Sequence, residues 1–181
     1  MTRTSTQERR TRRAALAVAA LPLAACGALP PRRVAAPDAL ALVPARTLAL
    51  APADVPGFHL TEELTPALGT VGLEDAFGRL GAYSATYAPT PGGTGGRDDI
   101  TSSVNTYAGT AHARAAFEAW RAAVPRQYRA SAPPADFKDE DVAVYLRDGA
   151  ALIGFRVRNV LGSVCAPEAR AESLARTMIS R

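Results

Sequence analysis

The sequence predicts an α+β fold in which an antiparallel β-sheet carries two to three helices on at least one face. Several runs alternate apolar and polar residues, as half-buried strands do. An Asp148-Gly149 pair separates two of these runs, which is a strong hairpin pattern. No glycine-rich turn typical of a parallel βαβ unit is present in the sequence. The expected element order is β-α-β-β-α-β-β-β-α within a single domain of residues 55–181.

The first half of this domain begins with an alternating run at residues 57–64, which predicts a strand. Leu73, Phe77 and Leu80 then recur at helical spacing, and Gly81 follows them, so a short helix is expected there. Two strands come next, joined by a glycine-rich hairpin loop. Their inward faces are marked by alternate residues: Tyr83, Ala85 and Tyr87 on one, and Ile100, Ser102, Val104 and Thr106 on the other.

The second half contains the clearest helical pattern of the chain. Four apolar residues recur at helical spacing between a capping Thr110 and a terminating Pro125: Ala113, Phe117, Trp120 and Val124. Two strands follow around the Asp-Gly turn, with Val142, Val144 and Leu146 on one and Ile153, Phe155 and Val157 on the other. Residues 160–165 predict a last strand. Pro167 opens a terminal helix with Ala171, Leu174 and Met178 facing inward and a Glu172–Arg176 pair outside.

Residues 1–25 have the parts of an export signal. Arg3, Arg9, Arg10, Arg12 and Arg13 form a basic start, and an apolar run from residue 14 follows it. That run is too short to cross a bilayer as a mature helix, which needs about 20 residues. The stretch Leu23-Ala24-Ala25-Cys26 resembles the bacterial lipobox, in which the Cys receives a diacylglyceryl group before cleavage. The resemblance implies a lipid anchor on Cys26, whereas an ordinary secretory signal with an accidental Cys is the alternative.

Residues 26–54 are expected to tether the domain to that anchor. Prolines recur through the segment, which disfavours a helix and favours an extended chain of about 3 Å per residue. Several leucines between residues 40 and 50 are more apolar than a linker requires. Part of the segment is therefore expected to pack on the domain or to form an edge strand.

The charge of the mature chain argues against nucleic-acid binding. The full sequence holds 21 basic and 17 acidic residues, and removing the five Arg and the Glu8 of residues 1–25 leaves 16 of each. The apparent basicity therefore belongs to the export signal. With Cys26 taken by lipid, Cys165 has no partner for an internal disulfide, and a small buried strand residue is its simplest role.

The sequence offers no catalytic set, cofactor motif or metal-ligand spacing. His59 and His112 are the two histidines, and neither has a second ligand at a suitable distance along the chain. One acidic cluster precedes a predicted strand and consists of Asp136, Asp139, Glu140 and Asp141. Its spacing is not that of a calcium loop, and Lys138 lies within it, so a solvent-exposed acidic segment leading into the strand is favoured. We therefore expect no enzyme activity, no cofactor and no bound metal, with a hydrolase as the least favoured reading.

Three arginines form the one candidate binding set. Arg147, Arg156 and Arg158 fall on alternate strand positions and could share one sheet face. That face would lie opposite Ile153, Phe155 and Val157. Together they would suit an anionic ligand or a lipid headgroup, because guanidinium groups bind such oxygens well. A polar outer face on a half-exposed sheet explains the same arginines without a ligand.

A broader layout extends over most of residues 82–165. The segments 102–107, 113–120, 139–143 and 155–161 together resemble small bacterial envelope lipoproteins of the PsbP-like type and the extracellular domains of some membrane-bound kinases. The resemblance implies a binding or sensing role with no established catalytic residues. The lipid anchor on Cys26 would hold the protein on the outer side of the cytoplasmic membrane or in the outer membrane of a bacterium. The ligand stays open between a small molecule and an envelope protein, and a structural or assembly lipoprotein that docks to a partner is the alternative.

Overall fold

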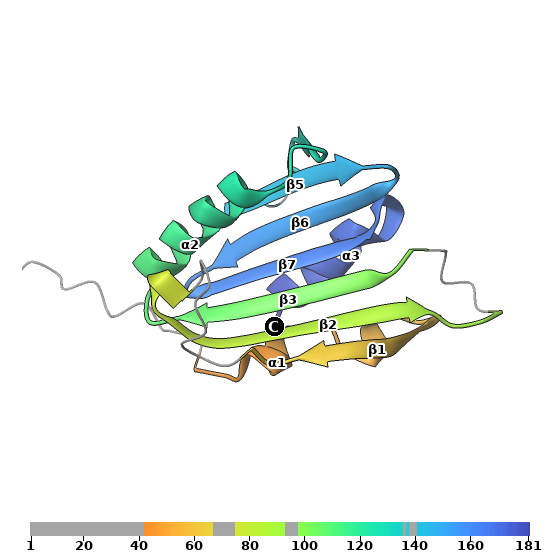
Figure 1. Ribbon diagram of the computed structural model, residues 1–181, viewed down its shortest axis with the longest axis horizontal. Helices are drawn as coiled ribbons and strands as arrows, with labels where there is room; N and C mark the ends of the chain where they lie inside the picture. The colour runs from red at the N-terminus through yellow and green to blue at the C-terminus, as the bar shows by residue number, and fades with distance from the viewer. Residues whose placement is uncertain (1–41, 67–74, 93–97, 136, 138–140) are drawn as a thin grey trace, which may run out of the picture. The chain divides into compact units, whose positions relative to one another are not determined.

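The sheet is continuous and antiparallel. The computed structural model describes residues 42–66, 75–92, 98–135, 137 and 141–181. Within them one seven-stranded sheet has the order β1-β2-β3-β7-β6-β5-β4 (Figure 1). The strands are β1 (Phe58–Leu64), β2 (Arg79–Pro89), β3 (Ile100–Tyr107), β4 (Arg129–Ser131), β5 (Asp141–Arg147), β6 (Ala150–Val157) and β7 (Val160–Pro167). The predicted α+β class with an antiparallel sheet is confirmed.

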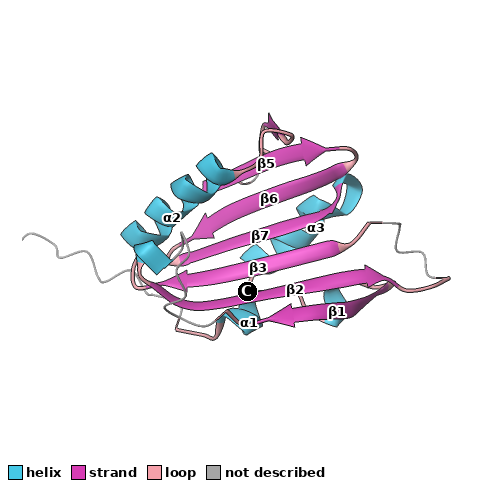
Figure 2. Cartoon of the chain, in the orientation of Figure 1, coloured by secondary structure: helices cyan, strands magenta, loops and turns pink. Residues whose placement is uncertain are grey.

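Helices pack on both faces of this sheet (Figure 2). The helices are α1 (Ala45–Leu48), α2 (Thr110–Ala123) and α3 (Glu168–Ile179), with 3-10 turns η1 (Pro52–Asp54) and η2 (Asp75–Phe77). The main core lies between one sheet face and α1 and α3, and a smaller core lies between the other face and α2. The large sheet thus has one well covered face and one that α2 covers in part (Figure 1).

Strict alternation along the strands decides which side chains enter the main core. Tyr83 and Val104 are cross-strand partners in β2 and β3, and both are buried against the α1 and α3 side. Val144 and Ile153 are partners in β5 and β6 and point the same way. The inward faces predicted for these four strands are therefore confirmed, because a period of two places alternate residues on one side of a sheet.

The turn between β5 and β6 has the predicted geometry. Asp148 and Gly149 both have positive φ values, 50° and 83°, and they separate the paired residues Arg147 and Ala150. Two central residues with positive φ define a type I′ turn, whose twist matches that of the flanking strands. Asp-Gly suits this turn because both residue types tolerate the left-handed conformation.

Helix α2 begins one residue earlier than a Thr110 cap would require. Gly109 occupies the N-cap position and Thr110 is the first helical residue, because the chain is still extended at Gly109. Ala113 and Phe117 are buried as expected. Trp120 stacks on Phe117 with 6.0 Å between ring centroids and meets Tyr145 of β5 edge-on at 5.9 Å. These rings attach α2 to the sheet.

Helix α3 agrees with its prediction. Ala171, Leu174 and Met178 are buried, and Arg176 pairs with Glu172 at 2.8 Å on the outer side. Pro167 precedes the first helical residue, where its fixed φ suits a helix start. The amphipathic spacing alone therefore sufficed to orient this helix on the sheet.

The prediction of a short helix between Leu73 and Leu80 was wrong. Residue 73 lies outside the described part of the chain, Phe77 ends the 3-10 turn η2, and β2 already starts at Arg79. Leu80 is 56 % exposed at a β-bulge between Arg79 and Gly81. Gly81 ends no helix; a side chain there would come within 2.9 Å of the Thr106 hydroxyl on the neighbouring strand. A glycine at such a bulge is common in sheets.

Strand β4 was not predicted. Its three residues, Arg129 to Ser131, are all exposed and pair with β5 at the edge of the sheet. A short strand with no buried side shows no alternation, so nothing in the pattern distinguishes it from a loop.

The segment before β1 contributes to the main core. Ala45, Leu48, Ala49, Leu50 and Val55 are buried there, so packing begins about ten residues before the expected domain boundary at 55. This agrees with the expectation that part of the tether packs on the domain. None of the helices in the described ranges combines the length and the hydropathy of a membrane-spanning segment.

Candidate functional site

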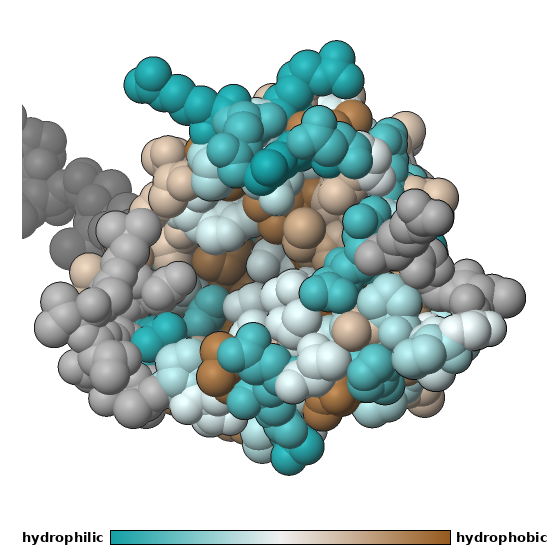
Figure 3. Space-filling model, turned by 45° about the vertical axis from the view of Figure 1, so that its right-hand side comes forward, coloured by the Kyte–Doolittle hydropathy of each residue, from teal (hydrophilic) through white to brown (hydrophobic). Residues whose placement is uncertain are grey.

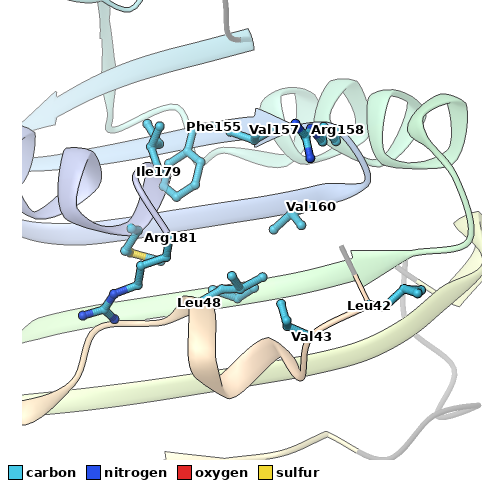
Figure 4. Close-up of a pocket in the computed structure, with 11 residues that line it drawn as sticks. Leu42, Val43, Leu48, Phe155, Val157, Arg158, Val160, Ile179 and Arg181 are labelled. Carbon is cyan, nitrogen blue, oxygen red and sulfur yellow. The ribbon is translucent and has the colours of Figure 1, made fainter. Parts of the chain in front are cut away.

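A pocket of about 440 Å³ opens on the main-core side of the sheet, between α1 and the end of α3 (Figure 4). Ligand sites of proteins fall at about 300–1,000 Å³, so the volume suits a small molecule. Nine of the lining residues are apolar and two are arginines: Leu42, Val43, Leu48, Val104, Phe155, Val157, Val160, Met178, Ile179, Arg158 and Arg181.

Strands β3, β6 and β7 form the floor of this pocket. Phe155 and Val157 share a face of β6 because they are two residues apart, and Val157 pairs with Val160 of β7 across the hairpin. Phe155 also pairs with Gly162, and its ring lies directly over that glycine. The missing side chain at Gly162 is what allows the Phe155 ring to lie at the pocket wall.

The segment at α1 forms one wall. Leu48 is buried, whereas Val43 is 48 % and Leu42 is 89 % exposed. Figure 4 shows Leu48 and Val43 across the hollow from Phe155 and Ile179. Apolar side chains therefore continue from the inside of the pocket to its open mouth.

The end of α3 forms the other wall and is tied to the segment before β1. Arg181 pairs with Asp54 at 2.5 Å, and its guanidinium also donates to the main-chain oxygen of Ala49. Its side chain is 27 % exposed. Two contacts to fixed oxygens make Arg181 a clamp between the two walls of the pocket.

Tyr87 of β2 attaches the segment that follows α1 to the sheet. Its hydroxyl donates to the main-chain oxygen of Leu50 at 2.6 Å, and both residues are almost fully buried. Burial raises the pKa of the Tyr87 phenol to about 12, with a smaller contribution from Tyr83. The phenol must keep its proton to donate this bond, so the bond is lost when Tyr87 ionises.

We expect stability to fall as the pH rises from about 10 to about 12. The pKa of Tyr87 is raised above its ordinary 10.0 in the folded chain, so its contribution is complete below pH 10 and disappears through pH 12. Urea unfolding at a series of pH values would measure this loss. A Tyr87→Phe chain should show a clearly flatter alkaline profile, and an unchanged profile would contradict the assignment.

The three arginines of the predicted anion site do not come together. Arg147 and Arg156 share the α2 side of the sheet but lie at opposite ends of the β5–β6 pair. Arg147 pairs with Asp148 at 3.2 Å, and Arg156 pairs with Asp141 at 2.5 Å. Arg158 lies in the β6–β7 turn and lines the pocket on the other side. The prediction that the three arginines share one face was therefore wrong, because Arg158 lies in a turn on the opposite side from Arg147 and Arg156.

Asn159 fixes the turn that carries Arg158. Its side-chain amide donates to the main-chain oxygen of Tyr107 at 3.0 Å. The main-chain N–H of Tyr107 in turn donates to the main-chain oxygen of Asn159 at 2.9 Å. Arg156 also donates to the main-chain oxygen of Arg158 at 3.1 Å. Arg158 has a φ of 52°, which a non-glycine residue adopts only when its surroundings hold it. The pocket rim at Arg158 is therefore well fixed.

The α2 side of the sheet is polar where α2 does not cover it. The register of β2, β3 and β7 places partly exposed hydroxyl residues there, and Figure 3 views part of this face, with near-neutral surface around its middle. These residues are Ser84, Thr86, Thr101, Ser103 and Ser163. Their side chains are neither charged nor strongly apolar, so they indicate no specific ligand.

Cys165 and the histidines form no reactive cluster among the described residues. Cys165 is half-buried beside Tyr128. The pKa of the Tyr128 phenol is raised mainly by burial and to a smaller extent by the neighbouring Cys165 thiol. His59 and His112 are exposed. The part of the chain that the structure describes holds no group of three or more His, Cys, Asp or Glu arranged for a metal ion. Asp136, Asp139 and Glu140 lie outside that part.

Comparisons with known proteins give one structural neighbour. The extracellular domain of PknH from Mycobacterium tuberculosis is 13 % identical over 80 % of this chain and 95 % of that domain, with a TM-score of 0.48. Similarity at this level does not identify a shared function. No family model matches the sequence, and no curated protein matches it.

Proposed function

We propose that the protein is a lipid-anchored binding or sensing module outside the cytosol of a bacterium, and that it takes its ligand in the pocket between α1 and α3. The pocket carries this proposal, because it is the one preformed apolar cavity of ligand size described above that is bordered by fixed charged groups. The proposal includes no reaction, since the described residues that line the cavity include no set of nucleophile, base and orienting group.

The lipobox residues Leu23 to Cys26 support the anchor. The first described pocket residue, Leu42, follows Cys26 by sixteen positions. A proline-rich chain of that length reaches at most some tens of ångströms, at about 3 Å per residue. The pocket mouth would then stay near the membrane surface, where a ligand from the envelope is encountered.

We expect Cys26→Ser to remove the protein from membranes. Two acyl chains on Cys26 anchor stably because each buried CH₂ contributes about 0.8 kcal/mol, whereas an unacylated chain has no such anchor. Labelled palmitate should enter the wild-type chain and not the variant, and fractionation should move the variant to the soluble extracytoplasmic pool. Cys165→Ser is the matched control and should behave as wild type. Membrane retention of the Cys26→Ser chain would contradict the anchor.

The binding role has a separate test. The full-length Cys26→Ser chain needs no detergent, so native mass spectrometry of the protein from its own host can reveal a retained small molecule. Val43→Asp should lower that occupancy, because Val43 is at the mouth and exposed enough to be changed without unfolding the chain. Retention that Val43→Asp leaves unchanged would place the ligand elsewhere and contradict the pocket assignment.

A further inference from the structure

We propose that the pocket binds a single-chain amphiphile with an anionic headgroup, with the headgroup at Arg158 and the alkyl chain over Phe155 and Val160. This inference rests on the proposed binding function and names the class of ligand. It follows from three properties of the lining: its apolar character, the sign of its charges, and its lack of neutral polar side chains.

The apolar lining requires an apolar ligand body. Apart from Arg158 and Arg181, every described lining residue is aliphatic, Phe or Met. Two of these residues, Leu42 and Val43, remain exposed at the mouth, where a bound chain would cover them. The volume of about 440 Å³ lies in the lower part of the range for ligand sites, which favours one chain over a two-chain lipid.

The charges select an anion. Among the described lining residues both charged groups are guanidinium groups, and none is a carboxylate. At one end of the pocket, Arg181 pairs with Asp54 and donates to the Ala49 carbonyl, and these contacts hold the two walls together. Arg158 lies at the other end of the pocket in Figure 4, on a turn fixed by Asn159. Guanidinium groups bind carboxylate and phosphate oxygens in a two-point geometry, which suits Arg158 to a headgroup.

The absence of neutral polar side chains argues against other ligand classes. None of the described lining residues carries a hydroxyl, amide or imidazole group. A saccharide or a polar peptide would lose hydrogen bonds to water without replacing them, at a cost for each buried polar group. An amphiphile has its polar atoms at one end, which is the distribution the pocket offers.

The test measures alkyl probes against the full-length Cys26→Ser chain by isothermal titration, below the micelle concentration of each probe. Decanoate, dodecanoate and tetradecanoate should bind about fourfold more tightly per added methylene, which corresponds to about 0.8 kcal/mol. Dodecanoate and dodecyl phosphate should both bind about tenfold more tightly than dodecanol or dodecyltrimethylammonium, because a hydrogen bond to a charged group is worth that factor.

Variants locate the headgroup and the chain. Arg158→Gln should weaken dodecanoate about tenfold and leave dodecanol unchanged, whereas Arg158→Lys keeps the charge and should recover part of the loss. Arg114→Gln, at an exposed position of α2, is the matched control and should change the affinity for neither probe. Val43→Asp should weaken every probe, and Leu64→Asp, an equally exposed leucine of β1, should weaken none. Circular dichroism verifies that each chain is folded.

Each outcome decides between defined alternatives. Equal affinity for dodecanoate and dodecanol, or an Arg158→Gln chain with unchanged dodecanoate affinity, overturns the anionic headgroup. Failure of all alkyl probes overturns the amphiphile. If native mass spectrometry still shows another small molecule that Val43→Asp displaces, the proposed binding function stands without this inference; if it shows none, both fail.

Discussion

Leu50→Ala should lower the free energy of unfolding by about 3 kcal/mol, the range found when a buried leucine is truncated in a packed core. Leu50 is 2 % exposed, and its main-chain oxygen accepts the Tyr87 hydroxyl. The cavity left at Leu50 lies under the α1 wall, where the sheet cannot close around it without moving that segment. Urea unfolding monitored by circular dichroism gives the change directly.

The matched control is Leu42→Ala in the same segment. Leu42 is 89 % exposed, so its truncation should change stability by less than about 0.5 kcal/mol. Removing residues 1–54 altogether should leave a chain that does not fold cooperatively, because the deletion takes Leu48, Leu50 and the Arg181–Asp54 pair with it. Equal stability of the Leu50→Ala and Leu42→Ala chains would show that this segment does not belong to the core.

Gly162→Ala should destabilise the protein by about 3 kcal/mol, at the upper end of the usual cost of overpacking. A methyl group at Gly162 would overlap the ring of Phe155 on the neighbouring strand. Phe155 is 3 % exposed and is enclosed by the main core, so its ring has nowhere to move except into the pocket. The same substitution should therefore also reduce the affinity for any ligand in the pocket.

Gly154→Ala is the matched control on the opposite face. A methyl group there would overlap the ring of Trp120, but Trp120 is only half-buried and can turn toward solvent. We expect a cost of about 1 kcal/mol, with no effect on ligand binding. Thermal unfolding of the two chains side by side measures the difference. A Gly154→Ala chain less stable than Gly162→Ala would contradict the view that confinement of the ring sets the cost.

The strands and the two longer helices could be predicted because local spacing dictates them. Alternation at Tyr83 or Ile153 places a side chain on one face whatever its distant neighbours are, and the Asp148-Gly149 turn needs two residues that tolerate positive φ. Such features depend on adjacent residues alone. They fixed the fold class and the inward faces of β2, β3, β5 and β6.

Local spacing failed where two structures share one pattern. Phe77 and Leu80 are three residues apart, which is a helical spacing. In the structure, however, Phe77 ends a 3-10 turn and Leu80 lies at a β-bulge in the following strand. The close approach of Thr106 to Gly81 decides between them. That contact joins residues far apart in the sequence, so no window around residue 80 contains it.

The pocket was beyond sequence reasoning for the same reason. It joins residues 42–48, the β6–β7 turn and the end of α3, which meet only after the sheet has formed. The sequence did mark Arg158 as a possible anion ligand, but it placed that residue with Arg147 and Arg156 because strand periodicity was extended through a turn. Arg158 has a φ of 52°, so the alternation no longer holds there.

The clamp made by Arg181 affects how the protein can be labelled. Because Arg181 reaches back to Asp54 and Ala49, a fluorophore or affinity handle attached at this residue would replace both contacts and lie beside the pocket. Reporter groups are better attached on the outer side of α2, for example at Arg114, which lies on the opposite side of the sheet. Binding data from chains labelled at Arg181 should be compared with data from such reporters.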